Sequence, residues 1–166
     1  MAENFIQLNK SDVLTLKIKT SDGEFTGEEL VFDLEDTELL LRLQDLLEKD
    51  KKNKENLRNQ ILIIDKRQDV KGKKLMSKNE EDKLKALNEF FKKEVEVYNM
   101  FLGENGVQKL LNGRKLGWTT LQEIDDIIDK QIAPYINVNM NKITDKIKEK
   151  YGQAVKRNEE KIEVIE

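Results

Sequence analysis

The sequence predicts an α+β protein, mostly α, in which a short N-terminal β-hairpin or small antiparallel sheet precedes a bundle of about four helices. Apolar and polar residues alternate from Val13 to Lys19 and again from Leu30 to Leu34, which is the period of a strand with one buried face. From about Asp36 the apolar spacing becomes that of a helix. No glycine or proline interrupts Asp36–Arg67, so one long helix is expected there.

The β-hairpin is expected within residues 5–34. The dipeptide Asp22-Gly23 between the two alternating runs suits a turn that needs positive φ. Phe5-Ile6-Gln7-Leu8 is a possible third strand. A lone hairpin is barely stable in water, so its apolar face must rest on a helix or on a neighbouring copy. The residues expected on that face are Leu14, Leu16, Ile18, Leu30, Phe32 and Leu34.

The first helix is expected over residues 36–65, with Asp33 or Asp36 as its N-terminal cap. Its middle, residues 48–55, is polar all round, but the apolar stripe resumes afterwards. The stripe consists of Leu39, Leu40, Leu43, Leu46, Leu47, Leu57, Ile61 and Ile64.

Residues 66–77 are predicted to be a basic linker or loop. Gly72 lies among several lysines, and apolar periodicity is lost. A basic patch for an anionic partner is the alternative. We favour a solvated loop because no aromatic residue is interleaved with the lysines.

A second helix is expected over residues 78–102. Ser77 and Glu80 have the spacing of a capping box, and Gly103 is suited to end the helix in the left-handed conformation. A short helix over residues 104–111 should follow. The expected stripe of the longer helix is Leu84, Leu87, Phe91, Val95, Tyr98 and Leu102.

The last helical region is expected over residues 120–150. Thr120 and Glu123 form a second capping-box match. Pro134 has no amide hydrogen and should kink or stop the helix near Gln131, after which the pattern resumes. We expect residues 1–152 to form a single domain and residues 153–166 to be a polar, mobile tail.

The composition bounds the function. Of 166 residues, 37% are apolar and 38% charged, against typical values of roughly 45–50% and about 25%. The net charge of −3 argues against a dominant nucleic-acid role. Cysteine and histidine are both absent, which removes disulfides, thiolate catalysis and the commonest general base and metal ligand. We therefore predict a protein that is not an enzyme.

No apolar run approaches the ~18–20 residues needed to cross a bilayer. The N-terminus lacks the basic start and apolar segment of a secretory signal. The sequence therefore predicts a soluble, intracellular protein without a membrane partner.

Two motifs invite a chemical interpretation, and both have a simpler one. Asp125, Asp126 and Asp129 could clamp a hard cation, but no acidic loop accompanies them; a solvated helix face is favoured. Residues 103–106 precede a short helix as phosphate-binding loops do, but the Gly-Lys-Ser/Thr half of that motif is missing. We predict no catalytic residues, no cofactor and no metal.

Two aromatic features could be either exposed, as a partner surface would be, or packed within the chain. Trp118 is the only tryptophan; it could anchor a partner, and we favour packing ahead of the Thr120 cap. Phe91 fits the core stripe, whereas Phe90 is rotated about 100° from it. One of the two should be exposed or packed on a second element.

The order of elements, together with one turn, carries a family resemblance. Leu102-Gly103-Glu104-Asn105-Gly106 ends a long helix and is followed by Leu110-Leu111. Over roughly Leu30 to Ile136 the chain resembles the tail assembly chaperones of long-tailed, siphovirus-like phages and prophages of Gram-positive bacteria. In that family a helix commonly ends in an aliphatic-Leu-Gly-Glu-Gly-like turn before a helix that leads to an apolar pair. The basic segment 66–78 and the polar continuation past Pro134 depart from that pattern.

The resemblance implies a non-enzymatic chaperone of the host cytoplasm that is not expected in the mature virion. Its partners would be the tape measure protein, which it keeps soluble, and the tail tube protein, which it helps recruit. The contact candidates under this hypothesis are Phe90, Tyr98, Phe101, Leu102, Val107, Leu111 and Trp118. Ordinary core packing is the alternative for each, and is favoured for Leu102 and Val107.

Two other functions stay open. One is a small phage-encoded inhibitor or adaptor that binds a host protein. The other is a structural subunit that assembles into homo-oligomers through the exposed edge of its hairpin.

Overall fold

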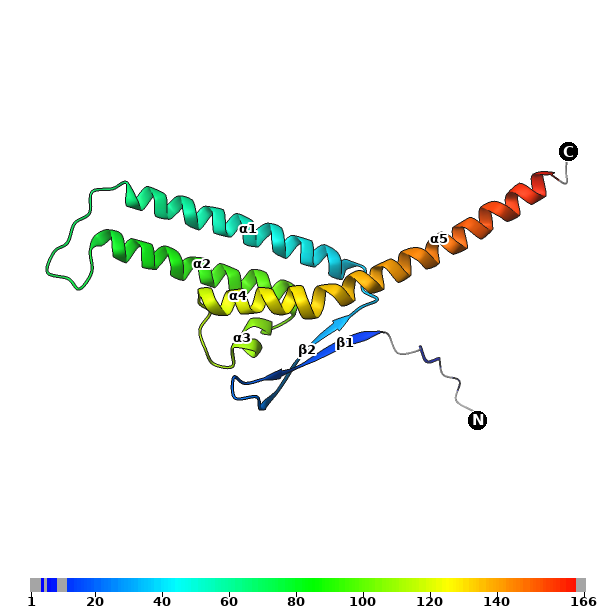
Figure 1. Cartoon of the computed structure of the whole chain (residues 1–166), viewed down its shortest axis with the longest axis horizontal. Helices are drawn as coiled ribbons and strands as arrows, with labels where there is room; N and C mark the ends of the chain where they lie inside the picture. The colour runs from blue at the N-terminus through cyan, green and yellow to red at the C-terminus, as the bar shows by residue number, and fades with distance from the viewer. Residues whose placement is uncertain (1–3, 5, 9–11, 164–166) are drawn as a thin grey trace.

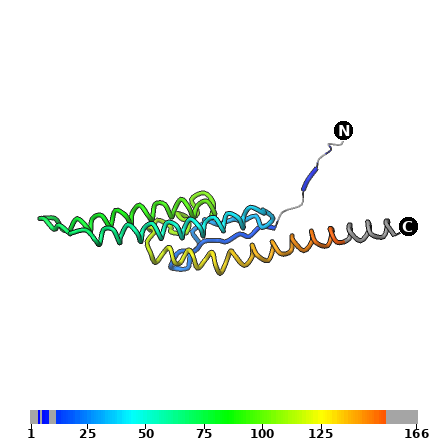
Figure 2. Tube along the Cα trace, turned by 90° about the horizontal axis from the view of Figure 1, so that it is seen from above, coloured from blue at the N-terminus to red at the C-terminus, as the bar shows by residue number. Residues whose placement is uncertain are grey.

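The computed structural model describes residues 4, 6–8 and 12–163, with residues 153–163 described by their backbone alone. It confirms the predicted fold class: a two-stranded antiparallel hairpin is followed by a mostly helical body (Figure 1). The molecule is elongated, with a pair of long helices extending to one side and the last helix to the other (Figure 2).

The hairpin joins β1 (Val13–Lys19) to β2 (Phe25–Asp33). Leu14 pairs with Phe32 and Leu16 with Leu30, and a bulge shifts the register between Lys17 and Lys19. Alternate residues face the helices, as the period-2 pattern predicted. The possible third strand is wrong for residues 6–8, which lie in no strand; Phe5 lies outside the described residues.

A helical hairpin forms the longest part of the molecule. α1 (Glu38–Asp65) and α2 (Lys78–Leu102) run side by side in opposite directions, joined by the predicted loop 66–77 (Figure 1). Asp36 accepts a hydrogen bond from the Glu38 amide at 2.9 Å, although it lies one residue before the N-cap position. The capping box of Ser77 and Glu80 is present with both of its hydrogen bonds.

The turn after α2 brings the end of α2 and the start of α3 close together. Gly103 has a positive φ of 98°, as predicted, but its ψ of 176° is extended rather than left-handed helical. α3 begins at Gly106 and ends at Leu111. A Cβ on Gly106 would lie 2.5 Å from the Cβ of Leu102, so only glycine permits this approach. The Asn99 side chain accepts from the Val107 amide at 2.8 Å and fixes the corner.

The C-terminal helical region begins earlier than predicted. α4 (Trp118–Ile127) has Gly117 as its N-cap, and the Thr120 hydroxyl accepts from the Gly117 amide at 2.8 Å. Thr120 is therefore the third helical residue and not the cap, because its short hydroxyl reaches back to the extended backbone at Gly117.

Pro134 neither stops nor breaks the helix. A π-helical turn, η1 (Ile128–Ile132), precedes α5 (Ala133–Glu163), and the Ala133 amide donates to the Ile128 carbonyl. A wider turn separates the proline ring from the carbonyl four residues back, the clash that otherwise kinks a helix. The expected polar tail is helical as far as Glu163, because residues 153–163 contain no glycine or proline and several strong helix formers.

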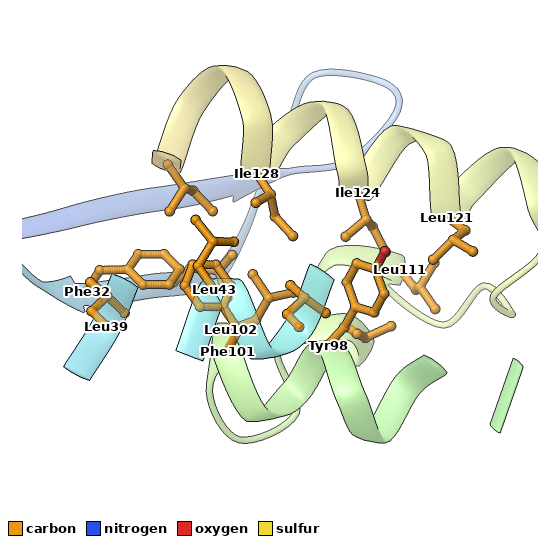
Figure 3. Close-up of a cluster of buried hydrophobic side chains, with 14 of the residues drawn as sticks. Phe32, Leu39, Leu43, Tyr98, Phe101, Leu102, Leu111, Leu121, Ile124 and Ile128 are labelled. Atoms are coloured by element: carbon orange, nitrogen blue, oxygen red, sulfur yellow. The ribbon is translucent and has the colours of Figure 1, made fainter. Parts of the chain in front are cut away.

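The core lies where the hairpin, α3 and α4 meet the ends of α1 and α2. Phe32 and Phe101 pack with their ring centroids 5.5 Å apart. Side chains from β2, α1, α2, α3 and α4 point toward one another in this cluster (Figure 3). The labelled members are Phe32, Leu39, Leu43, Tyr98, Phe101, Leu102, Leu111, Leu121, Ile124 and Ile128.

Candidate functional site

The predicted contact residues lie in the interior, with one exception. Trp118 is 51% exposed; its ring centroid lies 6.3 Å from that of Phe90 and 5.9 Å from Nζ of Lys54. The other six are buried in the hydrophobic core and offer no surface to a partner. They are Phe90, Tyr98, Phe101, Leu102, Val107 and Leu111.

Phe90 shows that the inward face of α2 is rotated from the predicted stripe. Phe90 is buried and Phe91 is only half-buried against it, in an edge-on arrangement with centroids 5.2 Å apart. Glu94 lies one turn further along the same buried face and is completely inaccessible. Sequence reasoning missed this residue because a glutamate breaks the apolar pattern.

Glu94 belongs to a buried polar cluster between α1, α2 and α4. The Asn53 amide donates to Glu94 at 2.8 Å, and Lys54 forms an ion pair of 2.9 Å with Asp50. The Tyr98 hydroxyl donates to Asp125 on α4. These bonds join α1 to α2 and α2 to α4.

Protonation of the cluster follows from its burial. Desolvation, followed by a hydrogen bond with Asp50, raises the pKa of Glu94 to about 8. Oδ1 of Asp50 and Oε2 of Glu94 have no other hydrogen-bond partner among the described residues. One proton held by Glu94 and donated to Asp50 satisfies both oxygens.

The pKa values of Tyr98 on α2 and of Asp125 on α4 are raised as well. Burial and the bond to Asp125 raise the pKa of Tyr98, which keeps the phenol a donor. Burial raises the pKa of Asp125, although Tyr98 and Lys54 oppose the shift. Because Glu94 and Tyr98 are shut off from solvent, we assign this cluster to the fold and not to a reaction.

Asp125 and Asp126 of α4 and Asp129 of η1 do not assemble a cation site. Asp125 is engaged with Tyr98, whereas Asp126 and Asp129 are exposed. Among the side chains that the structure describes, those of residues 4, 6–8 and 12–152, no group of three or more carboxylates is arranged to hold a metal ion.

The basic loop 66–77 is bound to the helices that it joins. The Asn79 side chain donates to the carbonyls of Ile64 and Arg67, both at 3.1 Å. Asp82 forms ion pairs with Arg67 at 3.2 Å and with Lys78 at 3.1 Å. These contacts support the interpretation as a structured, solvated loop.

An open groove of about 500 Å³ lies between α1 and α2. Its apolar floor includes Ile63, which is 64% exposed, and Ala86. Its charged side chains are Asp82, Lys85, Glu89 and Lys93 of α2, together with Arg67 just after α1; α1 itself contributes Gln60, Ile63 and Ile64. A signal for it exists in the sequence, since Ile61-Leu62-Ile63-Ile64 is a longer apolar run than one helix face can bury.

The second half of α5 has an apolar stripe with no partner in the described structure. Ile147 and Tyr151 are 62% and 71% exposed and continue the spacing of buried Ile136. The helix projects beyond the body at this point (Figure 1). Lys146 and Lys150 lie next to the stripe on a helical projection.

No helix in the described part of the chain combines the length and apolarity needed to cross a bilayer. Comparison of the chain with protein-family models, curated proteins and solved structures finds no match. The function must therefore be inferred from the residues and from the surfaces that they leave open.

Proposed function

We propose that the protein is a non-enzymatic tail assembly chaperone of a long-tailed phage or prophage. In the host cytoplasm it binds and solubilises the tape measure protein, helps recruit tail tube subunits, and is left out of the finished virion. The residues of the family resemblance support this proposal: Leu102–Gly106 form the tight corner between α2 and α3, and Leu111 packs in the core beyond it.

The groove between α1 and α2 is the observation that carries the proposal. A client rich in long amphipathic helices must have its apolar stripes covered until assembly. The groove presents exposed Ile63 together with Ile64 and Ala86, and the charged residues Asp82, Lys85, Glu89 and Lys93 lie along its α2 side; an apolar strip flanked by charges suits helix-in-groove recognition. The exposed stripe of α5 provides a second surface of the same kind.

Co-expression with the tape measure gene of the same cluster tests the proposal. We expect the soluble fraction of the tape measure protein to rise and the two proteins to purify as a complex. The proposal is overturned if its solubility is unchanged and no complex forms.

A matched pair of variants assigns the binding to the groove. Ile63→Glu places a charge on the groove floor, and Asn59→Glu places the same charge on α1 at an exposed position outside the groove. We expect the first to weaken the complex about tenfold, which corresponds to ~1.4 kcal/mol, and the second to leave it unchanged. Equal affinities of the two variants for the tape measure protein would show that the groove is not the binding site.

A further inference from the structure

A second groove, of about 380 Å³, lies between β1 and α4. Four consecutive residues of β1, Leu16 to Lys19, form one of its walls, together with Thr20 and Ser21 just after the strand. Successive side chains of a strand point to opposite faces, so consecutive residues line a groove only where it follows the backbone edge of the strand. The groove therefore runs along the outer edge of β1.

That edge is open. In the described part of the chain β1 pairs with β2 alone. The Leu34 amide donates to the Asp12 carbonyl, and the register continues unchanged to Lys17 opposite Glu29. In an antiparallel ladder alternate residues bond with the partner strand, so the even-numbered residues bond with β2. The N–H and C=O of Lys17 consequently point into the groove.

The opposite wall is helical and the floor is apolar. α4 contributes Thr120, Glu123, Ile124 and Ile127, which follow helical spacing along one face. Leu110 and Leu111 of α3 and Leu30 of β2, which pairs with Leu16, complete the floor. A strand edge facing a helix across an apolar floor accepts one extended peptide, whose main chain bonds to the edge and whose alternate side chains enter the floor.

The charges around the groove favour particular residues at the alternate positions of such a peptide, whose side chains do not enter the floor. Lys17, Lys19 and Arg114 line it, against one acidic residue, Glu123. Lys17 and Lys19 lie on the solvent face of β1. Acidic side chains directly across from them would form favourable cross-strand pairs.

A second copy of the chain fits less well. Its own β1 is bordered by its own α4, so an edge-to-edge approach would bring the two α4 helices against each other before the strands could pair.

We propose that the open edge of β1 binds an extended segment of a partner protein, in which apolar residues alternate with acidic ones, by strand addition between β1 and α4. This site goes beyond the proposed function: it recognises an extended chain, whereas the chaperone groove recognises a helix. A peptide probe tests it without any tape measure protein, so either proposal can fail alone.

The probe is a fluorescein-labelled peptide, Val-Glu-Val-Glu-Val-Glu-Val with blocked ends, titrated with the full chain and followed by fluorescence anisotropy. We expect saturable binding, and binding at least ~tenfold weaker for the peptide with lysine in place of glutamate. Two further peptides are N-methylated, one at every valine and one at every glutamate. In strand addition one set of amides bonds to β1 and the other faces away, so one methylated peptide should lose binding and the other keep it.

Variants at Lys17 locate the site. Lys17→Pro removes an outward N–H without removing a bond to β2, which edge strands tolerate. Lys17→Thr removes the same charge but keeps the amide. We expect Lys17→Pro to abolish binding, and Lys17→Thr to weaken it no more than severalfold. Circular dichroism should show that both variants keep the fold.

The proposal is overturned if the wild-type chain does not bind the glutamate peptide, or if the two methylated peptides behave alike. It is also overturned if Lys17→Pro binds as well as Lys17→Thr. If light scattering shows a dimer that Lys17→Pro abolishes, the edge belongs to a second copy and the proposal again fails. The methylated peptides keep the test decisive even if Lys17→Pro does not fold.

Discussion

Helix α2 and the second half of α5 have similar amphipathic sequences but very different surroundings. The inward face of α2 is covered by α1 and by the α3–α4 segment, and it even holds a completely buried carboxyl group, that of Glu94. On α5 the spacing that buries Ile136 continues to Ile147 and Tyr151, where the side chains stay exposed. Apolar periodicity thus predicts a helix with one apolar face, but not whether the same chain covers that face.

The largest expected effect on the free energy of unfolding comes from the buried face of α2. Phe101→Ala removes a buried ring that packs on Phe32 at 5.5 Å and should lower the free energy of unfolding by about 3–5 kcal/mol. Ile147→Ala, a truncation on the exposed stripe, should change it by less than about 0.5 kcal/mol. Urea denaturation of both variants measures the difference. Similar losses would mean that the α5 stripe is covered within the chain.

The buried carboxyl group should make stability depend on pH. Folding raises the pKa of Glu94 from 4.5 to about 8, so between these values the folded state holds a proton that the unfolded state has released. The stability contributed by this proton is therefore full below about pH 4.5 and falls as the pH rises through about 8. The loss is on the order of a few kcal/mol, because each pKa unit corresponds to ~1.4 kcal/mol.

The Glu94→Gln variant isolates this contribution. Its amide donates to Asp50 as the protonated carboxyl does but does not titrate, so the fall in stability between about pH 4.5 and 8 should shrink markedly. Asp50→Asn should reduce the same slope, because Asp50 helps to raise the pKa of Glu94. Thermal melts across this range test both variants; parallel profiles for the wild-type protein and the Glu94→Gln variant would contradict the shared proton.

Local signals allowed most of the fold to be predicted. The alternation of β1 and β2, the capping box at Ser77 and the glycine turn at Gly103 each depend on neighbouring residues, and each is present. The π turn before Pro134 was not predicted. A proline in the sequence shows which backbone hydrogen bond is lost, but not which backbone conformation accommodates the loss. How the backbone accommodates that loss depends on what packs around the helix.

The candidate surfaces were harder to predict than the fold. The seven contact candidates were chosen because they are apolar, which is also the property of core residues. Six of the seven are buried in the structure. The apolar run Ile61–Ile64 indicates that some side chain of α1 stays exposed, and a two-stranded hairpin must have open edges, but the local sequence does not show which side chain or which edge is accessible. The exposure of Ile63 and of the β1 edge depends on how far α1 extends past its neighbours and on which strand lies at the edge of the sheet.

A smaller effect on stability is expected at the N-terminal caps of α1 and α2. Ser77 caps α2 through its hydroxyl, whereas Thr37 at the start of α1 makes no side-chain capping bond. Ser77→Ala should destabilise the protein by about 1–2 kcal/mol, and Thr37→Ala should have almost no effect. Denaturant melts measure both; equal losses would show that the bond at Ser77 contributes nothing beyond helix propensity.

The smallest effect on stability should accompany a clear effect on binding. Ile147→Ser places a hydroxyl on the exposed stripe of α5, where the wild-type side chain buries little area, so the melting temperature should stay within error of the wild type. If the stripe binds the client, the same change should weaken the co-expressed complex severalfold, since a partner would desolvate the isoleucine. Asp145→Ser, on the opposite side of the helix by its spacing, is the matched control and should change neither quantity. Loss of stability without loss of binding would place the stripe inside the fold, and the contrast between α2 and α5 would then disappear.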